Sequence, residues 1–385
     1  MKMDILKIIG KNIGTLIEEK GISIRQLAEI LGVSHPTVSS YINGNSAIDS
    51  GKLYELSKYF NLSFDYFFGE GHQKIKLMYR ADNPAENFLE GDREFINRKI
   101  REYISLIGMD QFVAYIPQQY NLKIQNNKIQ NEEDCVIRKI AFEQRKMLGI
   151  EKIIPDNYYS IFAENNINVI AFASQNVSLF GCSFIDRNFG SIIFINDTEE
   201  ISEERQLFSL CHEYAHLLFH REEYLSDNTQ MRYQSKRGDI NEKIVNKFAE
   251  YFLVPENILK ECMESQAFKS NEKIDVKKLK NHFKVSYVTL ITALKDYGYM
   301  NDIKFKEVWK TIKYKKYDLI EPYPIEPVKN DEKNIKLMSK IRNKYITGEI
   351  SMSRIGEVLE KDVIEVRNLA RKWNEENEQL EEILR

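Results

Sequence analysis

Cysteine is scarce in this chain, and long apolar runs are absent. The four cysteines lie far apart without a C-x-x-C pair, so we expect neither a disulfide framework nor a structural cysteine–zinc site. No uninterrupted apolar stretch approaches the roughly 20 residues that span a membrane, and the first residues lack the apolar segment of a signal peptide. These features predict a reduced, cytoplasmic protein that does not enter a membrane.

A strong net charge is also missing. The 55 basic and 58 acidic side chains leave a net charge of −3 over 385 residues. This balance gives no global attraction to nucleic acid or to an anionic membrane, so any such binding must be local. The length is sufficient for two or three domains. The residues that carry the function are therefore expected in local motifs rather than in the overall composition.

Short helices broken by polar turns are predicted in residues 1–70. Ser23 can cap a helix that ends at Gly32, and Ser34 can cap a second helix that stops at Gly44. Two helices joined by a tight glycine-containing turn form a helix-turn-helix. The segment resembles the Cro and lambda-repressor class of DNA-binding domains (the XRE family). The resemblance implies that the helix at 35–43 enters the major groove of double-stranded DNA, with a homodimer on the operator.

The charge of this segment is unusual for a DNA-binding domain. Residues 35–43 contain neither lysine nor arginine, and residues 1–70 carry seven basic against eight acidic side chains, so phosphate neutralisation is weak. A helix-turn-helix that serves dimerisation or docks another such domain is the alternative interpretation. Six side chains could still bond base edges and phosphates: His35, Thr37, Ser39, Ser40, Tyr41 and Asn43.

A helical and polar linker is predicted over residues 71–134. Its residues 90–120 have the pattern of a long charged helix, and 121–134 form a polar tract without periodicity, which cannot bury a core. The next domain is expected to begin at residue 135, with a helix at 136–148. Three β-rich stretches follow, separated by turn residues as in an antiparallel meander: 167–172, 177–185 and 191–196.

The pattern H-E-x-x-H stands in an apolar-periodic helix. Residues four apart lie on one face of an α-helix, so His212 and His216 can hold one Zn²⁺ while Glu213 points at the metal-bound water. Cys211 points about 100° away from His212 and is interpreted as a small core residue. His220 lies roughly 12 Å along the helix from His212, so we expect it to support the site or the helix end rather than to bind the same ion.

A catalytic zinc needs a third protein ligand and an open position for water. Glu242 falls within the buried stripe of a downstream helix, where a carboxylate is costly unless a cation meets it. Asn246, one turn further along the same face, could hold a ligand histidine through its second ring nitrogen. Glu250 is the competing carboxylate, and its neighbours Lys243 and Lys247 favour a solvated surface position.

Residues 136–300 resemble the ImmA/IrrE family of zinc metallo-endopeptidases. The matching features are the strand ending at Asn196, the helix 205–220 and the segment 242–255. The family's motif carries its third ligand on the first glutamate of the last segment, which corresponds to Glu242. Val245 and Tyr214 depart from the commoner residues without removing a ligand. The resemblance implies a gluzincin-like Zn²⁺ site and a protein substrate, often a helix-turn-helix repressor or an antitoxin-like partner.

Two further features each have two interpretations. Tyr224 and Tyr233, in the loop between the two ligand helices, are candidates for stabilising the oxyanion, although ordinary surface or packing tyrosines are favoured. Lysines interleaved with aromatic residues over 304–317 can bind nucleic acid, but a solvated face is favoured. Pro322 and its neighbouring prolines predict a stiff linker, and residues 331–385 are expected to be helical.

The sequence therefore predicts a multi-domain, mostly α protein with a small β-sheet. An all-α helix-turn-helix domain (1–70) and the linker precede an α+β zincin-like metallopeptidase domain (135–300) and a helical C-terminal region (301–385). The favoured function is a zinc endopeptidase fused to a repressor-type DNA-binding domain, which regulates by cleaving a protein partner, as in toxin–antitoxin systems. The alternative is a transcription regulator or antitoxin whose peptidase-like domain binds or senses without turnover.

Overall fold

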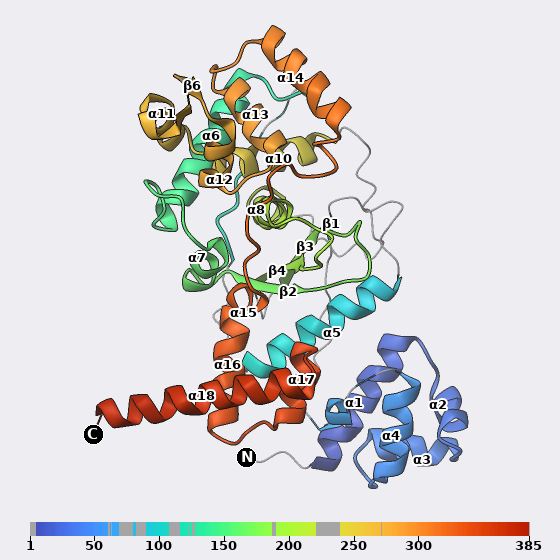
Figure 1. The fold of residues 1–385 in the computed structure, drawn as a ribbon. Helices are drawn as coiled ribbons and strands as arrows, with labels where there is room; N and C mark the ends of the chain where they lie inside the picture. Colours follow the sequence, from blue (N-terminus) through green and yellow to red (C-terminus); the bar gives the residue numbers. More distant parts are fainter. Residues whose placement is uncertain are drawn as a thin grey trace. The chain divides into compact units, whose positions relative to one another are not determined.

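The computed structural model divides into two compact units, Met1–Lys76 and Leu77–Arg385 (Figure 1). No helix in the described part of the chain combines the length and apolar character that a membrane span requires. The described residues are 5–60, 62, 64–68, 80–81, 90–107, 116–122, 124, 128–186, 190–220, 239–270 and 272–384.

The first unit is all helical and contains the predicted helix-turn-helix. Ser23 forms a capping box with Gln26, and the Ser34 hydroxyl accepts a hydrogen bond from the backbone N–H of Thr37, so both predicted caps are confirmed. Gly10 lets the first and third helices touch, because a Cβ there would lie 2.4 Å from the main-chain oxygen of Tyr41. The elements are α1 (Ile5–Lys20), α2 (Ile24–Ile30), α3 (His35–Ile42), α4 (Ser50–Tyr59) and the 3-10 turn η1 (Phe64–Phe67).

A four-stranded sheet begins the second unit. Its strands are β1 (Arg80–Ala81), β2 (Asn168–Phe172), β3 (Gly181–Asp186) and β4 (Gly190–Asn196), in the order β1-β3-β4-β2. β3 and β4 form an antiparallel hairpin, but β2 runs parallel to β4. The predicted antiparallel meander is therefore wrong, because β4 lies between β2 and β3 and pairs in parallel with β2.

The side chain of Asn196 gives a physical reason for this order. Its Oδ1 accepts from the Ser174 backbone N–H at 2.8 Å, and its Nδ2 donates to the carbonyl oxygens of Asn176 and Leu179. These bonds fix the connection after β2 against the end of β4. After β2 the chain therefore crosses the place that β4 later fills, and it forms β3 on the opposite side of β4 from β2.

Helix α8 (Glu203–Phe219) lies between the sheet and α10 (Ile240–Leu253), and α6 (Asn131–Met147) packs against α10. α6 begins before the predicted 136, so the last residues of the supposedly aperiodic tract 121–134 form its first turn. The remaining elements of this part are α7 (Tyr158–Glu164), α11 (Glu256–Glu264), η3 (Gln266–Phe268), β5 (Lys269–Ser270), β6 (Lys273–Ile274), α12 (Val276–Phe283) and α13 (Tyr287–Asp296).

The C-terminal helices pack within the second unit. α15 and α16 contact β2 and α7 respectively, and α16 also packs against α5 (Glu90–Ile107) and α18. α5 is the described part of the long charged helix predicted for 90–120, and the described residues 116–120 are not helical. The C-terminal elements are α14 (Asp302–Lys315), α15 (Asn330–Lys333), α16 (Ile335–Ile346), α17 (Met352–Leu359) and α18 (Val363–Leu384).

Candidate metal centre

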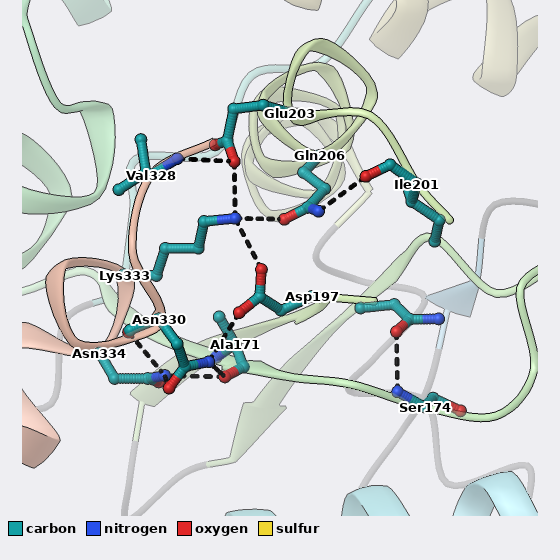
Figure 2. Close-up of polar contacts among 11 residues, drawn as sticks. Ala171, Ser174, Asp197, Ile201, Glu203, Gln206, Val328, Asn330, Lys333 and Asn334 are labelled. Atoms are coloured by element: carbon teal, nitrogen blue, oxygen red, sulfur yellow. Dashed lines mark hydrogen bonds and ion pairs between the residues drawn. The ribbon is translucent and has the colours of Figure 1, made fainter. Parts of the chain in front are cut away.

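Helix α8 is buried on nearly all of its faces because the sheet covers one side and α10 the other. Ser202 caps its N-terminus, and Glu203 and Glu204 occupy its first turn, where the helix dipole favours negative charge. Each carboxylate meets a buried lysine from further along the chain: Glu203 lies 2.7 Å from Lys333, and Glu204 lies 2.5 Å from Lys280. Figure 2 shows the Lys333 contacts. The start of α8 is therefore fixed by ion pairs as well as by packing.

Three donor atoms meet at the middle of α8. The Nε2 atoms of His212 and His216 are 3.0 Å apart, and the carboxylate oxygens of Glu242 lie 3.3 Å and 3.6 Å from them. A tetrahedral zinc with bonds of about 2.0–2.1 Å separates its ligand atoms by roughly 3.3 Å. In the described part of the chain, this is the one group of three His, Cys, Asp or Glu side chains with donor atoms within 4.8 Å of one another. Its spacing and chemistry fit zinc.

The outer ring nitrogens of both histidines also have contacts. Nδ1 of His212 lies 3.0 Å from Oδ1 of Asn246, at the position predicted for Asn246. Nδ1 of His216 lies 3.1 Å from Nδ1 of His220, the residue that caps the end of α8. An Asn oxygen only accepts, so His212 carries its proton on Nδ1 and presents the lone pair of Nε2. A neutral His220 can accept from His216 in the same way.

Strand β3 lies against the carboxylate of Glu213. The Ser183 hydroxyl donates to Glu213 Oε2 at 2.5 Å, and both side chains are fully buried. Gly181 is two residues away on the same strand face, and a Cβ there would lie 3.4 Å from Glu213 Cγ and 3.0 Å from the Phe194 oxygen. Sequence reasoning missed Ser183, because alternation along the strand pairs 181 with 183 but does not reveal which helix that face meets.

An extended substrate can pair with an edge strand of the sheet, and both β3 and β4 are candidates for that edge. β4 is excluded because β3 and β2 occupy its two edges. β3 pairs on its outer side with β1, which places Arg80 opposite Ser183 and Ala81 opposite Cys182. The strand that touches Glu213 is thus also the strand that holds a segment of this same chain.

Glu250 is not the solvated residue that its neighbouring lysines suggested. It is 6% exposed, and burial raises the pKa of its carboxyl to about 7, although Lys247 at 3.6 Å opposes the rise. The burial of Glu250 has a tertiary cause, because α6 and α13 pack against α10, and α6 brings Asp134 and Arg138 near. The prediction for Cys211 is confirmed: the side chain is fully buried, and burial raises the pKa of its thiol. Tyr224 and Tyr233 lie outside the described residues.

Replacing Glu250 with glutamine should stabilise the protein at alkaline pH. The folded pKa of about 7 lies above the ordinary value of 4.5, so the contribution of Glu250 to stability is full below pH 4.5 and is lost as the pH rises through 7. At 1.4 kcal/mol for each pKa unit, the rise from 4.5 to about 7 predicts a gain of about 3 kcal/mol at pH 8 that shrinks towards pH 5. Urea unfolding at both pH values measures it. Glu261→Gln, an exposed glutamate, is the control, and a gain independent of pH would contradict the assignment.

The predicted DNA-contacting residues lie on α3 and at its end. His35 and Asn43 are exposed, and Asn43 is the C-cap. The Thr37 hydroxyl lies 2.8 Å from that of Ser34, and the Ser40 hydroxyl accepts from Ser46 at 2.9 Å, so these two groups have local partners. Ser39 and Tyr41 are half-buried, and Tyr41 packs against the hydrophobic core of the first unit.

Two known families match the chain. Residues 13–67 match the helix-turn-helix family, and residues 162–295 match the IrrE N-terminal-like domain. The chain thus combines a DNA-binding domain of XRE type with a domain of the metallopeptidase class. More particularly, the second domain is ImmA/IrrE-like, as the resemblance in the sequence predicted. No curated protein matches the chain.

Proposed function

We propose that this protein is a zinc-dependent endopeptidase fused to a repressor-type DNA-binding domain, and that it regulates by cleaving a protein partner. The observation that carries the proposal is the tetrahedral spacing of the donor atoms of His212, His216 and Glu242. The two family matches support it, because one implies DNA binding and the other a metallopeptidase.

The residues around the site have separate tasks in this proposal. When bound, Zn²⁺ would lower the pKa of its water to about 7 and polarise the scissile carbonyl. Glu213 takes a proton from the attacking water and passes it to the leaving amine. Ser183 holds one oxygen of that carboxylate through its hydrogen bond. Asn246 and His220 fix the orientation of the two imidazoles.

The substrate class follows from the sheet edge and from the fused DNA-binding domain. A peptide that adds to a sheet is held by main-chain hydrogen bonds. The outer edge of β3 is the nearest such position to Glu213, and a peptide there would replace Arg80–Ala81. We therefore propose an extended segment of a repressor or antitoxin-like protein as substrate. A helix-turn-helix protein encoded beside this one is the first candidate to test.

Removing the metal should abolish cleavage. We expect the purified protein to hold about one zinc per chain by elemental analysis, and a chelator to stop cleavage of the partner. Added zinc should restore it, because the apo site has no other Lewis acid. Gel electrophoresis with mass spectrometry of the fragments checks both steps. A zinc-loaded protein that binds DNA but cuts no co-encoded repressor or antitoxin-like protein would support the alternative, a regulator whose peptidase-like domain only binds or senses.

A further inference from the structure

The turn between α2 and α3 recurs between α17 and α18. α2 is capped by Ser23, and its end is followed by Gly32 in the left-handed region at φ +60° and by the cap Ser34. α17 is capped by Ser351, and Glu360 follows it at φ +54°. In both turns the left-handed residue comes nine positions after the first cap and two before the second.

The second cap of the C-terminal turn is Asp362. Its carboxylate accepts from the backbone N–H groups of Ile364 and Glu365, and Glu365 bonds back to the Asp362 N–H. This is a capping box, like the one that begins α2. A left-handed residue other than glycine costs free energy, so Glu360 indicates that the turn geometry is imposed by the packing of the helices.

The buried positions also match. Leu27 and Ile355 both stand four residues after the first cap and are 0% exposed. Val38 and Val366 both stand fifteen residues after it and are 0% and 3% exposed. α16 packs against α18 as α1 packs against α3. Residues 335–384, here called the C-terminal helical unit, therefore form a second helix-turn-helix outside both family matches.

A third copy of the turn, between α12 and α13, shows that the turn alone does not imply a DNA-binding surface. Asp275 caps α12, Lys284 is left-handed at φ +56°, and Ser286 caps α13. The second helix of this copy is a core element, because Leu290, Ile291 and three more of its ten residues are buried. The same turn there serves packing within the peptidase domain. A turn that presents a binding surface therefore differs from a turn that serves packing in that its second helix is exposed.

α18 is more exposed than α13 at corresponding positions, because it carries exposed residues where α13 has the half-buried Tyr287 and Val288 and the buried Ile291. Its first two residues, Val363 and Ile364, are 66% and 69% exposed, and Arg367, Asn368 and Arg371 are exposed as well. These three residues correspond in position to Ser39 and Ser40 of α3 and to Asn43, its C-cap. Arginine reads guanine and phosphate and asparagine reads adenine, so the polar side chains here suit DNA better than those of α3. Arg371 donates to Asn368 at 2.6 Å, which orders the pair.

Basic side chains gather in the first part of the C-terminal helical unit. Residues 335–372 contain nine basic and five acidic side chains, a net charge of +4. Residues 373–384, at the far end of α18, add five acidic and no basic side chains, so the whole unit carries −1, as residues 1–70 do. Phosphate neutralisation supplies most non-specific affinity for DNA. From the repeated turn, the exposed helix and the positive charge of residues 335–372, we propose that α18 is a second DNA-reading helix that enters the major groove of double-stranded DNA.

The test measures binding of the full-length protein to a mixed-sequence 40-base-pair duplex by fluorescence anisotropy, over a series of salt concentrations. The variant Arg367→Gln/Arg371→Gln should weaken binding about tenfold at 0.1 M salt and lower the salt slope by about two, one for each lost cation. The control is Lys306→Gln/Lys310→Gln, which makes the same change of charge on exposed residues of α14. Circular dichroism checks that both variants fold.

Two results would overturn the proposal. In the first, the α18 and α14 variants lose the same affinity, which would show only a general charge effect. In the second, the arginine variant binds DNA as the wild type does, which by itself excludes α18 as a DNA-reading helix. A change of oligomeric state in Val363→Ser/Ile364→Ser, measured by light scattering, would then assign the exposed face of α18 to protein docking. Repeating the comparison in a Ser39→Glu background, which sets a negative charge on α3 against phosphates, removes the contribution of the first unit.

Discussion

Glu213→Gln should abolish cleavage of the partner protein while the bound zinc remains. Glutamine keeps the size of the side chain and can still accept the Ser183 hydrogen bond, but it cannot take a proton from water. Losing a general acid–base typically costs 10²–10⁴ in rate, so we expect a fall in kcat of about that size. His212, His216 and Glu242 are unchanged, so zinc content by elemental analysis should equal that of the wild type.

The matched control is Glu250→Gln, which makes the same chemical change at another buried glutamate. It lies on α10, the helix that also carries Glu242, and should leave kcat within about twofold of the wild type because it touches no reacting atom. If Glu213→Gln cleaves like the wild type, the base is another group. If the variant loses its zinc, Glu213 holds the site together rather than performing the proton transfer.

Features set by neighbours in the sequence were predictable. The caps Ser23 and Ser34 lie within three residues of the N–H groups they bond. The spacing of His212 and His216 is a property of one helix. The periodicity of α10 placed Glu242 and Asn246 one turn apart on one face, and in the structure both contact the histidines of α8, although Glu242 is only partly buried and Asn246 is exposed. In each case the residue and the groups it contacts lie on the same helix or on two neighbouring helices.

Features set by distant parts of the chain were not predictable in this way. The parallel pairing of β2 with β4 depends on bonds of Asn196 to residues 174–179. Glu250 has lysine neighbours along its own helix, but its burial depends on α6 and α13. Ser183 required knowing that β3 lies over α8. Periodicity reports that a face is buried and does not report what it is buried against.

The C-terminal region is the largest gap of this kind, and Lys333 shows why. It was expected only to be helical, yet its side chain is 1% exposed and its ammonium lies 2.6 Å from Asp197 and 2.7 Å from Glu203. It also donates to Gln206 at 2.6 Å. Figure 2 shows α8 and the segment after β4 converging on this one cation. Sequence separations of more than 120 residues hide such an arrangement.

A second buried ion pair, of the same kind, holds the carboxylate of Glu204. Lys280 lies 2.5 Å from Glu204 and 3.4 Å from Glu321, and both side chains of the first pair are fully buried. The Ile325 backbone N–H also donates to Glu204. The proline-containing segment predicted as a stiff linker therefore supplies hydrogen bonds to the first turn of the proposed zinc-binding helix. The segment therefore packs against α8 within the second unit.

Lys333→Met should strongly destabilise the second unit. Methionine preserves the length and apolar stem, but it leaves Glu203 and Asp197 close together without their cation. Removing one partner of a buried ion pair costs about 3–5 kcal/mol, so we expect a fall of that size in the free energy of unfolding measured with urea. Lys329→Met, an exposed lysine beside the same helix, is the control and should change stability by less than about 0.5 kcal/mol.

The pH dependence separates this electrostatic cause from a packing defect. Burial already raises the pKa of Glu203 above its ordinary 4.5, and Lys333 opposes that rise. Without Lys333 the folded pKa climbs further, so Glu203 contributes fully below pH 4.5 and loses its contribution as the pH rises through the folded value. The deficit should therefore be larger at pH 8 than at pH 5. Adding Glu203→Gln should recover part of it, because the buried negative charge disappears. A deficit that is equal at both pH values and unchanged in the double variant would attribute the loss to packing instead.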